Sequence, residues 1–388
     1  MRRKLIYFCP ETRGGLADYS WAQAEAIARQ EVDVLFVTKP GFQRVSAAGV
    51  RVLDALKEDP ERVSKIRWVR RYRRLQTLIK NMAILRGLIL SLHVKEVIWS
   101  SFFEYGSPLW AGHFEDLLQH GVRMGVMVHD PIRDYRIGPG WWYRRSISRA
   151  KGLFHCFFSH TVSLGPTSHE NILADPWIQN LTHLVPHGLY CFPASTRSRE
   201  EMRRQWNIPE DVRVWLSFGH IRDGKNLDRV IEALAEVPHD YLWVVGREQS
   251  AEQKPVEFYQ AFAEKKGIAD RCRWTHEHVP EEEVGNYFEA SDGVLLTYSK
   301  DFHSSSGVLS HAVHFRRPVI VSGGEGPLLQ EVKDYHLGKI IESESSMALR
   351  EAMLQWSSKD KVAEWDRYER DHSWDENAKR VLASMEKI

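Results

Sequence analysis

Two runs of small residues stand where a helix is expected to begin after a buried strand. Residues 304–307, three serines and a glycine, follow the apolar run 293–299, and a glycine-rich turn ending in Pro327 follows the run 318–324. Small side chains let backbone N–H groups approach an anion, and the helix dipole adds a favourable field. Two such helix starts side by side indicate a diphosphate or nucleotide site; the alternative is a pair of ordinary strand–helix turns.

Polar residues also end two expected strands in the first half of the chain. The run 123–131 predicts a strand with His129 and Asp130 at its end, and the run 96–106 predicts a strand with Glu104 near its end. Ligands bind at the carboxyl ends of the strands in open α/β sheets. We therefore expect these side chains near a binding edge, although a lone histidine is more often structural.

Strands and helices must alternate along the chain to position these residues. The opening reads as a strand at 4–10, a turn at Gly14 and Gly15, an amphipathic helix, and a strand at 33–39. Further strands are expected at 96–106, 123–131, 152–158, 163–168, 181–188, 212–218, 241–247, 293–299 and 318–324. This alternation predicts an α/β fold with doubly wound, Rossmann-like sheets. The absence of G-x-G-x-x-G argues against a dinucleotide dehydrogenase.

The stretch 298–331 resembles the donor-binding core of the retaining GT-B glycosyltransferases of family 4, the glycosyl transferases group 1. Ala312 and Arg317, followed by Pro-Val-Ile, match the family pattern. His303 and His311 stand where the family has acidic residues, of which the first contacts the transferred sugar and the second the nucleotide ribose. Imidazole can donate or accept a hydrogen bond but, when neutral, supplies no negative charge. Activity that depends on neutral imidazoles is expected to fall as the pH drops through about 6.5.

The resemblance extends over nearly the whole chain and implies roles for further residues. Lys225 matches a family lysine that grips the donor diphosphate, Arg222 lies near the matching arginine position, and cations there stabilise the leaving group. His129 resembles the family's active-site histidine. The resemblance implies His129, Arg222, Lys225 and His303 as catalytic residues. The donor-binding residues that it implies are Gly14, Gly15, Gly219, Arg222, Lys225, His278, Val279, Ser305, Ser306, Gly307, Val308 and His311.

The acceptor is expected on the first half of the chain, which is basic. Residues 1–190 carry a net charge of +9 and residues 191–388 one of −8. The span 62–95 holds ten basic residues and no acid, and part of it has helical spacing of apolar residues. It predicts either a helix that meets an anionic membrane surface or a core helix with a solvated basic face. The acceptor-side candidates are Asp18, Tyr19, Glu104, Asp130, Trp141 and Trp142, although the tryptophans would fit a core equally well.

Composition excludes several other classes. The four cysteines lie far apart without metal-ligand spacing, which indicates reduced, structural thiols in a cytoplasmic protein. No uncharged apolar run of 18 residues is present, so a transmembrane helix is not expected. No nucleic-acid motif accompanies the basic span, so nucleic acid is not expected as a partner. No metal or other cofactor is expected to be required, because cations and helix dipoles fill that role.

The resemblance implies a GT-B architecture, with two Rossmann-like domains facing across a cleft. We expect an acceptor-side domain at 1–190, a linker at 191–200, a donor domain at 201–360 and a C-terminal helix at 361–388 that returns to the first domain. The expected reaction transfers a hexose from a UDP- or GDP-sugar to a hydroxyl of a growing glycan or lipid-linked glycan, with retention. The expected location is the cytoplasm, with peripheral binding to the inner face of the membrane. An inverting GT-B transferase and a non-catalytic nucleotide-sugar-binding partner of another transferase are the alternatives.

Overall fold

The structure is a computed structural model, and it divides into two compact units. Unit 1 comprises Met1–Gly188 and His372–Ile388, and unit 2 comprises Leu189–Asp371. The residues that it describes are 2–44, 46–58, 67–129, 131–133, 139–160, 170–190, 192–250, 252–356 and 363–387. The expected strand at 163–168 and the candidate Asp130 lie outside these residues.

Unit 1 is built on a seven-stranded parallel sheet in the order β3-β2-β1-β4-β5-β7-β9. Its strands are β1 (Arg3–Phe8), β2 (Val32–Val37), β3 (Val50–Leu53), β4 (Glu96–Trp99), β5 (Arg123–Val128), β7 (Cys156–Ser159) and β9 (Thr182–Leu184). Its helices are α1 (Gly15–Arg29), α2 (Arg67–Ser91), α3 (Glu115–Gln119), α4 (Gly140–Lys151), α5 (Pro176–Asn180) and α14 (Trp374–Glu386), with short 3-10 turns at Ser107–Leu109, Ala111–Phe114 and Ile172–Ala174. A two-stranded antiparallel ribbon joins β6 (Ile132–Arg133) to β8 (Glu170–Asn171).

Both faces of this sheet are buried, as the apolar runs predicted. Side chains alternate across a strand, so Ile6 and Phe8 of β1 pack in the core on the α2 side, whereas Leu5 and Tyr7 pack in the core on the α1 and α14 side. Helix α2 covers its face with an apolar stripe that includes Met82. Burying a large apolar side chain contributes about 1.5–3 kcal/mol, so the two layers hold the sheet from both sides.

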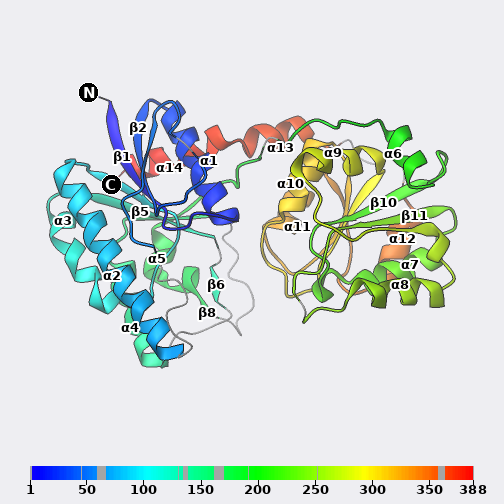
Figure 1. Ribbon diagram of the computed structural model, residues 1–388, viewed down its shortest axis with the longest axis horizontal. Coiled ribbons are helices and arrows are strands. Elements are labelled where there is room, and N and C mark those ends of the chain that lie inside the picture. Colours follow the sequence, from blue (N-terminus) through cyan, green and yellow to red (C-terminus); the bar gives the residue numbers. More distant parts are fainter. Residues whose placement is uncertain are drawn as a thin grey trace. The chain divides into compact units, whose positions relative to one another are not determined.

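Helix α14, drawn in red in Figure 1, belongs to unit 1 although it lies at the end of the chain. Glycines let it pack closely: a Cβ on Gly125 of β5 would lie 2.9 Å from the sulfur of Met385. Likewise, a Cβ on Gly188 would lie 2.1 Å from Cδ2 of Trp374. Real Cβ atoms do not approach other atoms so closely, so a side chain at either glycine would push the helix away from the sheet.

Unit 2 repeats the architecture with a six-stranded parallel sheet in the order β12-β11-β10-β13-β14-β15. Its strands are β10 (Arg213–Phe218), β11 (Asp240–Val245), β12 (Cys272–Thr275), β13 (Gly293–Thr297), β14 (Val319–Ser322) and β15 (Gly338–Ile340). Its helices are α6 (Arg199–Gln205), α7 (Leu227–Ala235), α8 (Val256–Lys265), α9 (Glu281–Ala290), α10 (Gly307–His314), α11 (Pro327–Asp334), α12 (Ser346–Leu354) and α13 (Trp365–Asp371), with 3-10 turns at Asp223–Lys225 and Ala269–Arg271. Helices α9, α10 and α11 pack on one face, and α7, α8 and α12 on the other.

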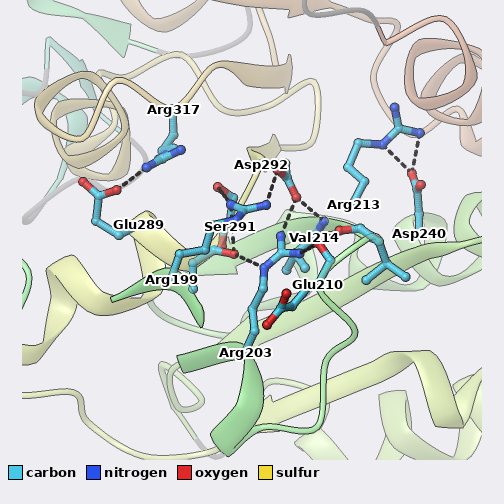
Figure 2. A network of polar contacts seen from close by, with 12 residues as sticks. Arg199, Arg203, Glu210, Arg213, Val214, Asp240, Glu289, Ser291, Asp292 and Arg317 are labelled. Carbon is cyan, nitrogen blue, oxygen red and sulfur yellow. Dashed lines mark hydrogen bonds and ion pairs between the residues drawn. The ribbon is translucent and has the colours of Figure 1, made fainter. Parts of the chain in front are cut away.

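A network of charged side chains closes the N-terminal edge of this sheet (Figure 2). Arg203 of α6 is buried and donates to the Asp292 carboxylate at 2.7 Å, and Arg199 donates to the other oxygen at 2.6 Å. Asp292 also accepts the backbone N–H of Val214 in β10 at 2.8 Å. Because buried charges are stable only when paired, this network fixes α6 to the sheet. Arg317, which matched the family pattern, pairs with Glu289 at the same edge, away from the carboxyl ends of the strands.

The predicted fold class is confirmed: two Rossmann-like, doubly wound parallel sheets, as in GT-B proteins. Gly307 and Pro327 begin α10 and α11 after β13 and β14, as the two runs of small residues predicted. The short strand β3 was not predicted, because its four residues carry too little apolar pattern to stand out. Within the described residues, no helix is both long and apolar enough to cross a bilayer.

Candidate functional site

The turn between β10 and α7 brings a glycine, an arginine and a lysine to the carboxyl end of the second sheet. Gly219 follows β10 with a φ of +88°, which residues with a side chain rarely adopt. Asn226, with a φ of +51°, then directs the chain into α7. The hydroxyl of Thr297, at the end of β13, donates to the backbone oxygen of Lys225 at 2.7 Å. The turn is therefore held by the neighbouring strand.

Lys225 and Arg222 form the cationic part of this turn. The Lys225 ammonium donates to the backbone oxygen of Phe218, and desolvation together with the charge of Arg222 lowers the pKa of Lys225 to about 7. The Arg222 guanidinium lies 5.4 and 5.5 Å from the ring centroids of Tyr298 and Phe302. An anion bound here would favour the charged form and raise the pKa of Lys225.

The first turn of α10 faces the same place. Ser306 caps the helix, is buried and shares a hydrogen bond with a buried tyrosine hydroxyl. The Ser305 hydroxyl is buried without a hydrogen-bond partner. A Cβ on Gly219 would lie 3.6 Å from Cγ2 of Val308 and 3.5 Å from Nζ of Lys225. The structure thus gathers these expected donor-binding residues around the N-terminus of α10, whose N–H groups suit an anion.

His311 lies one turn into α10 and is held on several sides. Its Nδ1 donates to the backbone oxygen of Gly307 at 2.9 Å, so Nε2 carries the lone pair of the neutral ring. The rings of Phe192 and Phe288 are nearly parallel to the imidazole, at centroid distances of 3.7 and 5.5 Å. Burial lowers the pKa of His311 to about 4. This pKa lies below the ordinary histidine value near 6.5 on which the expected pH dependence of activity was based.

The second glycine turn packs against His303. Nδ1 of His303 donates to the backbone oxygen of Glu325 at 2.8 Å, which leaves Nε2 as the acceptor of the neutral ring. A Cβ on Gly324 would lie 2.2 Å from Cε1 of His303, and one on Gly326 would lie 2.6 Å from its backbone oxygen. These glycines therefore permit the close approach of two loops, and the turn acts by positioning His303.

A cavity of about 370 Å³ opens beside Gly219 at the carboxyl ends of β10 and β11. The expected donor-binding residues His278 and Val279 line it, the first exposed and the second buried. Gly246, which the sequence did not single out, also lines it: a Cβ there would lie 2.2 Å from the backbone oxygen of Gly219. A larger cavity of about 990 Å³ lies at the opposite, N-terminal end of the same sheet, beside Arg213.

Unit 1 places its expected residues in two different settings. Gly14, with a φ of +85°, turns the chain into α1, and both Gly14 and Gly15 have open space where a Cβ would project. Asp18 is exposed on α1 and lies 3.6 Å from a nitrogen of Arg44. Tyr19 is buried, and its hydroxyl accepts a hydrogen bond from the Asn377 side chain at 2.9 Å. Tyr19 therefore anchors α14 to α1.

Three histidines surround Tyr19. The ring centroids of His129, His160 and His187 lie 4.6, 5.2 and 5.3 Å from the tyrosine ring. His129 donates from Nε2 to the backbone oxygen of Ser100 at 3.1 Å, and desolvation and the nearby His187 lower its pKa to about 4. The neutral His129 therefore presents Nδ1 as an acceptor. Sequence reasoning did not single out His160, because a lone histidine after a strand carries no specific signal.

The remaining acceptor-side candidates lie apart from this cluster. Glu104 is buried, and Asp130 lies outside the described residues. Trp141 is 61 % exposed at the start of α4, whereas Trp142 is half-buried, and their rings meet edge to face at 5.8 Å. Among the described residues, no group of three or more His, Cys, Asp or Glu side chains is placed to hold a metal ion.

Several solved glycosyltransferase structures share this fold. A glycosyltransferase from Rickettsia africae aligns with all of this chain over 98% of its own length, at 12% identity and a TM-score of 0.69. A sucrose-phosphate synthase from Thermosynechococcus elongatus aligns with all of this chain over 99% of its own length, at 16% identity and a TM-score of 0.65. The chain matches HepE from Anabaena, solved with UDP and glucose, over 100% of both chains at 12% identity and a TM-score of 0.66. No curated protein matches the chain by sequence.

The family comparison covers the unit that holds the cationic turn and α10. Residues 198–381 match the model of the family described as glycosyl transferases group 1. This range begins at the capping residue of α6 and contains Arg222, Lys225, His303 and His311. The chain is therefore similar over residues 198–381 to the glycosyl transferases group 1, and it has the two-domain fold of the GT-B glycosyltransferases.

Proposed function

We propose that this protein transfers a hexosyl group from a nucleoside diphosphate sugar to an acceptor hydroxyl, with retention of configuration. The observation that carries the proposal is the convergence of Arg222, Lys225 and the N-terminus of α10 beside a cavity at the carboxyl end of the second sheet. Such an edge is where open α/β sheets bind their ligands. The UDP bound to Anabaena HepE supports a uridine nucleotide as the first candidate.

The donor nucleotide is assigned to unit 2. The base enters the cavity lined by His278 and Val279, where it meets backbone groups and an apolar wall. The ribose hydroxyls donate to Nε2 of His311, which accepts as the family's carboxylate would. The diphosphate lies between Lys225 and the first N–H groups of α10.

The leaving group determines what catalysis requires. Cleavage of the bond between the sugar and the β-phosphate develops negative charge on the nucleoside diphosphate, which Lys225, Arg222 and the α10 N-terminus stabilise. In a front-face substitution the departing phosphate oxygen takes the acceptor proton, so no protein nucleophile is needed. Nε2 of His303 accepts a hydrogen bond from a hydroxyl of the transferred sugar.

Unit 1 is assigned the acceptor side. The neutral His129 accepts a sugar hydroxyl at Nδ1, and the open space at Gly14 and Gly15 admits a ligand near the backbone. Asp18, Glu104 and Asp130 are the carboxylates available if the reaction instead inverts and requires a base. Tyr19 contributes by anchoring α1 and α14, since its ring and hydroxyl are occupied by packing.

A lipid-linked acceptor is supported by a basic and aromatic surface on α2 and α4. Tyr72 is 56 % exposed and Trp141 is 61 % exposed. The two helices flank one segment, because a Cβ on Gly106 would lie 2.6 Å from Leu75 of α2, while Ser107 donates to Ser146 of α4 at 2.5 Å. The exposed arginines on these helices include Arg73, Arg74, Arg144 and Arg145. Amphipathic aromatic rings and cations suit the headgroup region of an anionic membrane.

A non-catalytic nucleotide-sugar-binding protein is the second candidate. It is favoured by the presence of His303 and His311 where the resemblance implies two acids. Binding without turnover would then be the whole function of the site.

The test begins with a thermal-shift screen against UDP, GDP and ADP. A ligand that binds only the folded state raises the melting temperature, and at a given concentration a tighter ligand raises it further. Incubation of the purified protein with the matching nucleotide sugars then shows whether the donor is hydrolysed or transferred. Hydrolysis would exclude the non-catalytic candidate, and the anomeric configuration of the product decides between retention and inversion. Failure to bind any of the three nucleotides would refute the proposal.

A further inference from the structure

The segment 192–197, at the start of unit 2, contributes a side chain to the proposed donor site. The ring of Phe192 stacks on the imidazole of His311 with the centroids 3.7 Å apart and the planes at 22°. It also meets His314, further along α10, edge to face at 5.5 Å. Sequence reasoning placed Phe192 in a linker and gave it no role, because an isolated aromatic in a polar segment carries no pattern.

The residues that follow Phe192 are fixed to unit 2. The side-chain oxygen of Asn286, a buried residue of α9, accepts the backbone N–H groups of Thr196 at 2.8 Å and of Arg197 at 3.0 Å. The backbone oxygen of Pro193 lies close to α9, since a Cβ on Gly285 would be 3.2 Å from it. The segment 192–197 is therefore part of the donor unit.

Two contacts together define the orientation of His311. The bond from Nδ1 to the oxygen of Gly307 fixes one edge of the ring. Phe192 covers a ring face at close range, whereas Phe288, the other nearly parallel ring, is 5.5 Å away. Removal of the Phe192 ring would leave the imidazole free to rotate away from Gly307 and open to water. His314 is the ionisable neighbour whose electrostatic effect, after desolvation, contributes to the lowered pKa of His311.

We propose that Phe192 is a positioning residue for the nucleotide: it holds His311 with the Nε2 lone pair presented to the ribose hydroxyls. The inference rests on the proposed function, which places the ribose at His311. It assigns to the segment at the start of unit 2 a direct part in donor binding. A phenylalanine that merely filled space would affect stability without acting through His311.

The first experiment is a double-mutant cycle read by calorimetric titration with UDP. Phe192→Leu should weaken UDP binding about two- to tenfold, the range that corresponds to one aromatic stacking contact. Phe192→Tyr keeps the ring and should bind as the wild type does. In the His311→Ala background, Phe192→Leu should cause no further loss, because residues that act through one group are not additive.

A second experiment reads His311 without any ligand. NMR titration of the imidazole should give a pKa of about 4 in the wild type and a higher value in Phe192→Leu, because the exposed ring is easier to protonate. Phe258→Leu is the matched control: it makes the same substitution at an aromatic residue that is 44 % exposed on α8, on the opposite face of the sheet from α10. It should leave both UDP affinity and the pKa of His311 unchanged.

The outcomes separate this inference from the function on which it rests. Additive losses in the double variant, or an unchanged pKa of His311 in Phe192→Leu, would overturn the positioning role. If the wild type bound neither UDP nor any other nucleotide, the proposed function would fail. The positioning role is tested separately: a pKa of His311 in the ligand-free Phe192→Leu protein equal to that of the wild type would reject it.

Discussion

Replacement of Lys225 by methionine should stabilise the ligand-free protein and disable it at the same time. Methionine keeps a long, flexible side chain and removes the charge. In the ligand-free protein, desolvation and the nearby Arg222 lower the pKa of Lys225 from 10.5 to about 7. The fold therefore disfavours the ammonium form of Lys225, and a site that suits an anion is electrostatically unfavourable while no anion is bound.

The size of the effect follows from proton linkage. One pKa unit corresponds to about 1.4 kcal/mol, so a lysine that keeps its place destabilises the fold at pH 7 by at most about 4 kcal/mol. The substitution also removes the hydrogen bond from Nζ to the Phe218 oxygen, which contributes about 1 kcal/mol. With some relaxation of the side chain towards water, Lys225→Met should raise the free energy of unfolding by about 1–3 kcal/mol.

The sign of the pH dependence is fixed by the direction of the shift. A lysine whose folded-state pKa is lowered destabilises the fold fully below about pH 7, and the effect fades as the pH rises towards 10.5. The gain from Lys225→Met should therefore be largest at or below pH 7 and small at pH 10. Donor turnover should fall by about 100- to 1000-fold, the cost of removing one preorganised donor to a developing anion.

Urea unfolding at pH 7 and pH 10, together with donor turnover, measures both parts of this prediction. Lys265→Met is the matched control, since Lys265 is exposed on α8, and it should change neither quantity. A less stable Lys225→Met protein at pH 7 would show that the ammonium is not strained. Wild-type turnover in a folded Lys225→Met protein would refute the assignment of Lys225 to the leaving group.

The remaining predictions concern pH, a loop and a membrane. Burial lowers the pKa of both His129 and His311 to about 4, so both side chains should stay neutral down to about pH 4. The free energy of unfolding should fall as the pH drops from about 6.5 to 4, because only the unfolded chain takes up protons in that range. A sharp loss of UDP affinity at pH 6.5 would contradict this. Gly324→Ala should displace His303 and cost about 1–3 kcal/mol in unfolding experiments, and an unchanged melting temperature would show that the loops are loose. The protein should sediment with anionic but not with neutral vesicles and should dissociate from them in high salt. Changing Arg73, Arg74, Arg144 and Arg145 to serine should abolish vesicle binding without altering UDP affinity. Equal binding to anionic and neutral vesicles would show that the binding is not electrostatic.

The sequence was sufficient for the fold because the apolar pattern is strong. Buried parallel strands give continuous apolar runs, and helices between them show one apolar face. The sequence pattern of α2 was harder to interpret: the side chain of Tyr72 falls within the apolar spacing of the helix, yet it is 56 % exposed. Helical spacing alone does not determine which residues at the edge of a stripe reach the core, because that depends on the neighbouring elements.

The site was predicted less completely than the fold. Residues that match motifs, such as Lys225 and His311, could be named because their spacing is local. Gly246 and Phe192 could not, because their importance comes from neighbours distant in sequence: Gly246 meets the oxygen of Gly219, and Phe192 meets His311. The same limit applies to pKa values, since His311 titrates near 4 only because packing removes water from its ring.

If His303 and His311 stand where the resemblance implies acids, they change the charge of the candidate site more than its hydrogen bonding. Each fixes its Nδ1 proton on a backbone oxygen and keeps an Nε2 lone pair, so each retains the accepting role of a carboxylate without the charge. In the part of the chain that the structure describes, the charge that shifts the pKa of Lys225 comes from Arg222 and from no carboxylate. The ligand-free site is therefore left with unbalanced positive charge. A nucleoside diphosphate supplies the missing anion, so we expect the loss of the acids to favour tight binding of the product UDP and to make its release slow.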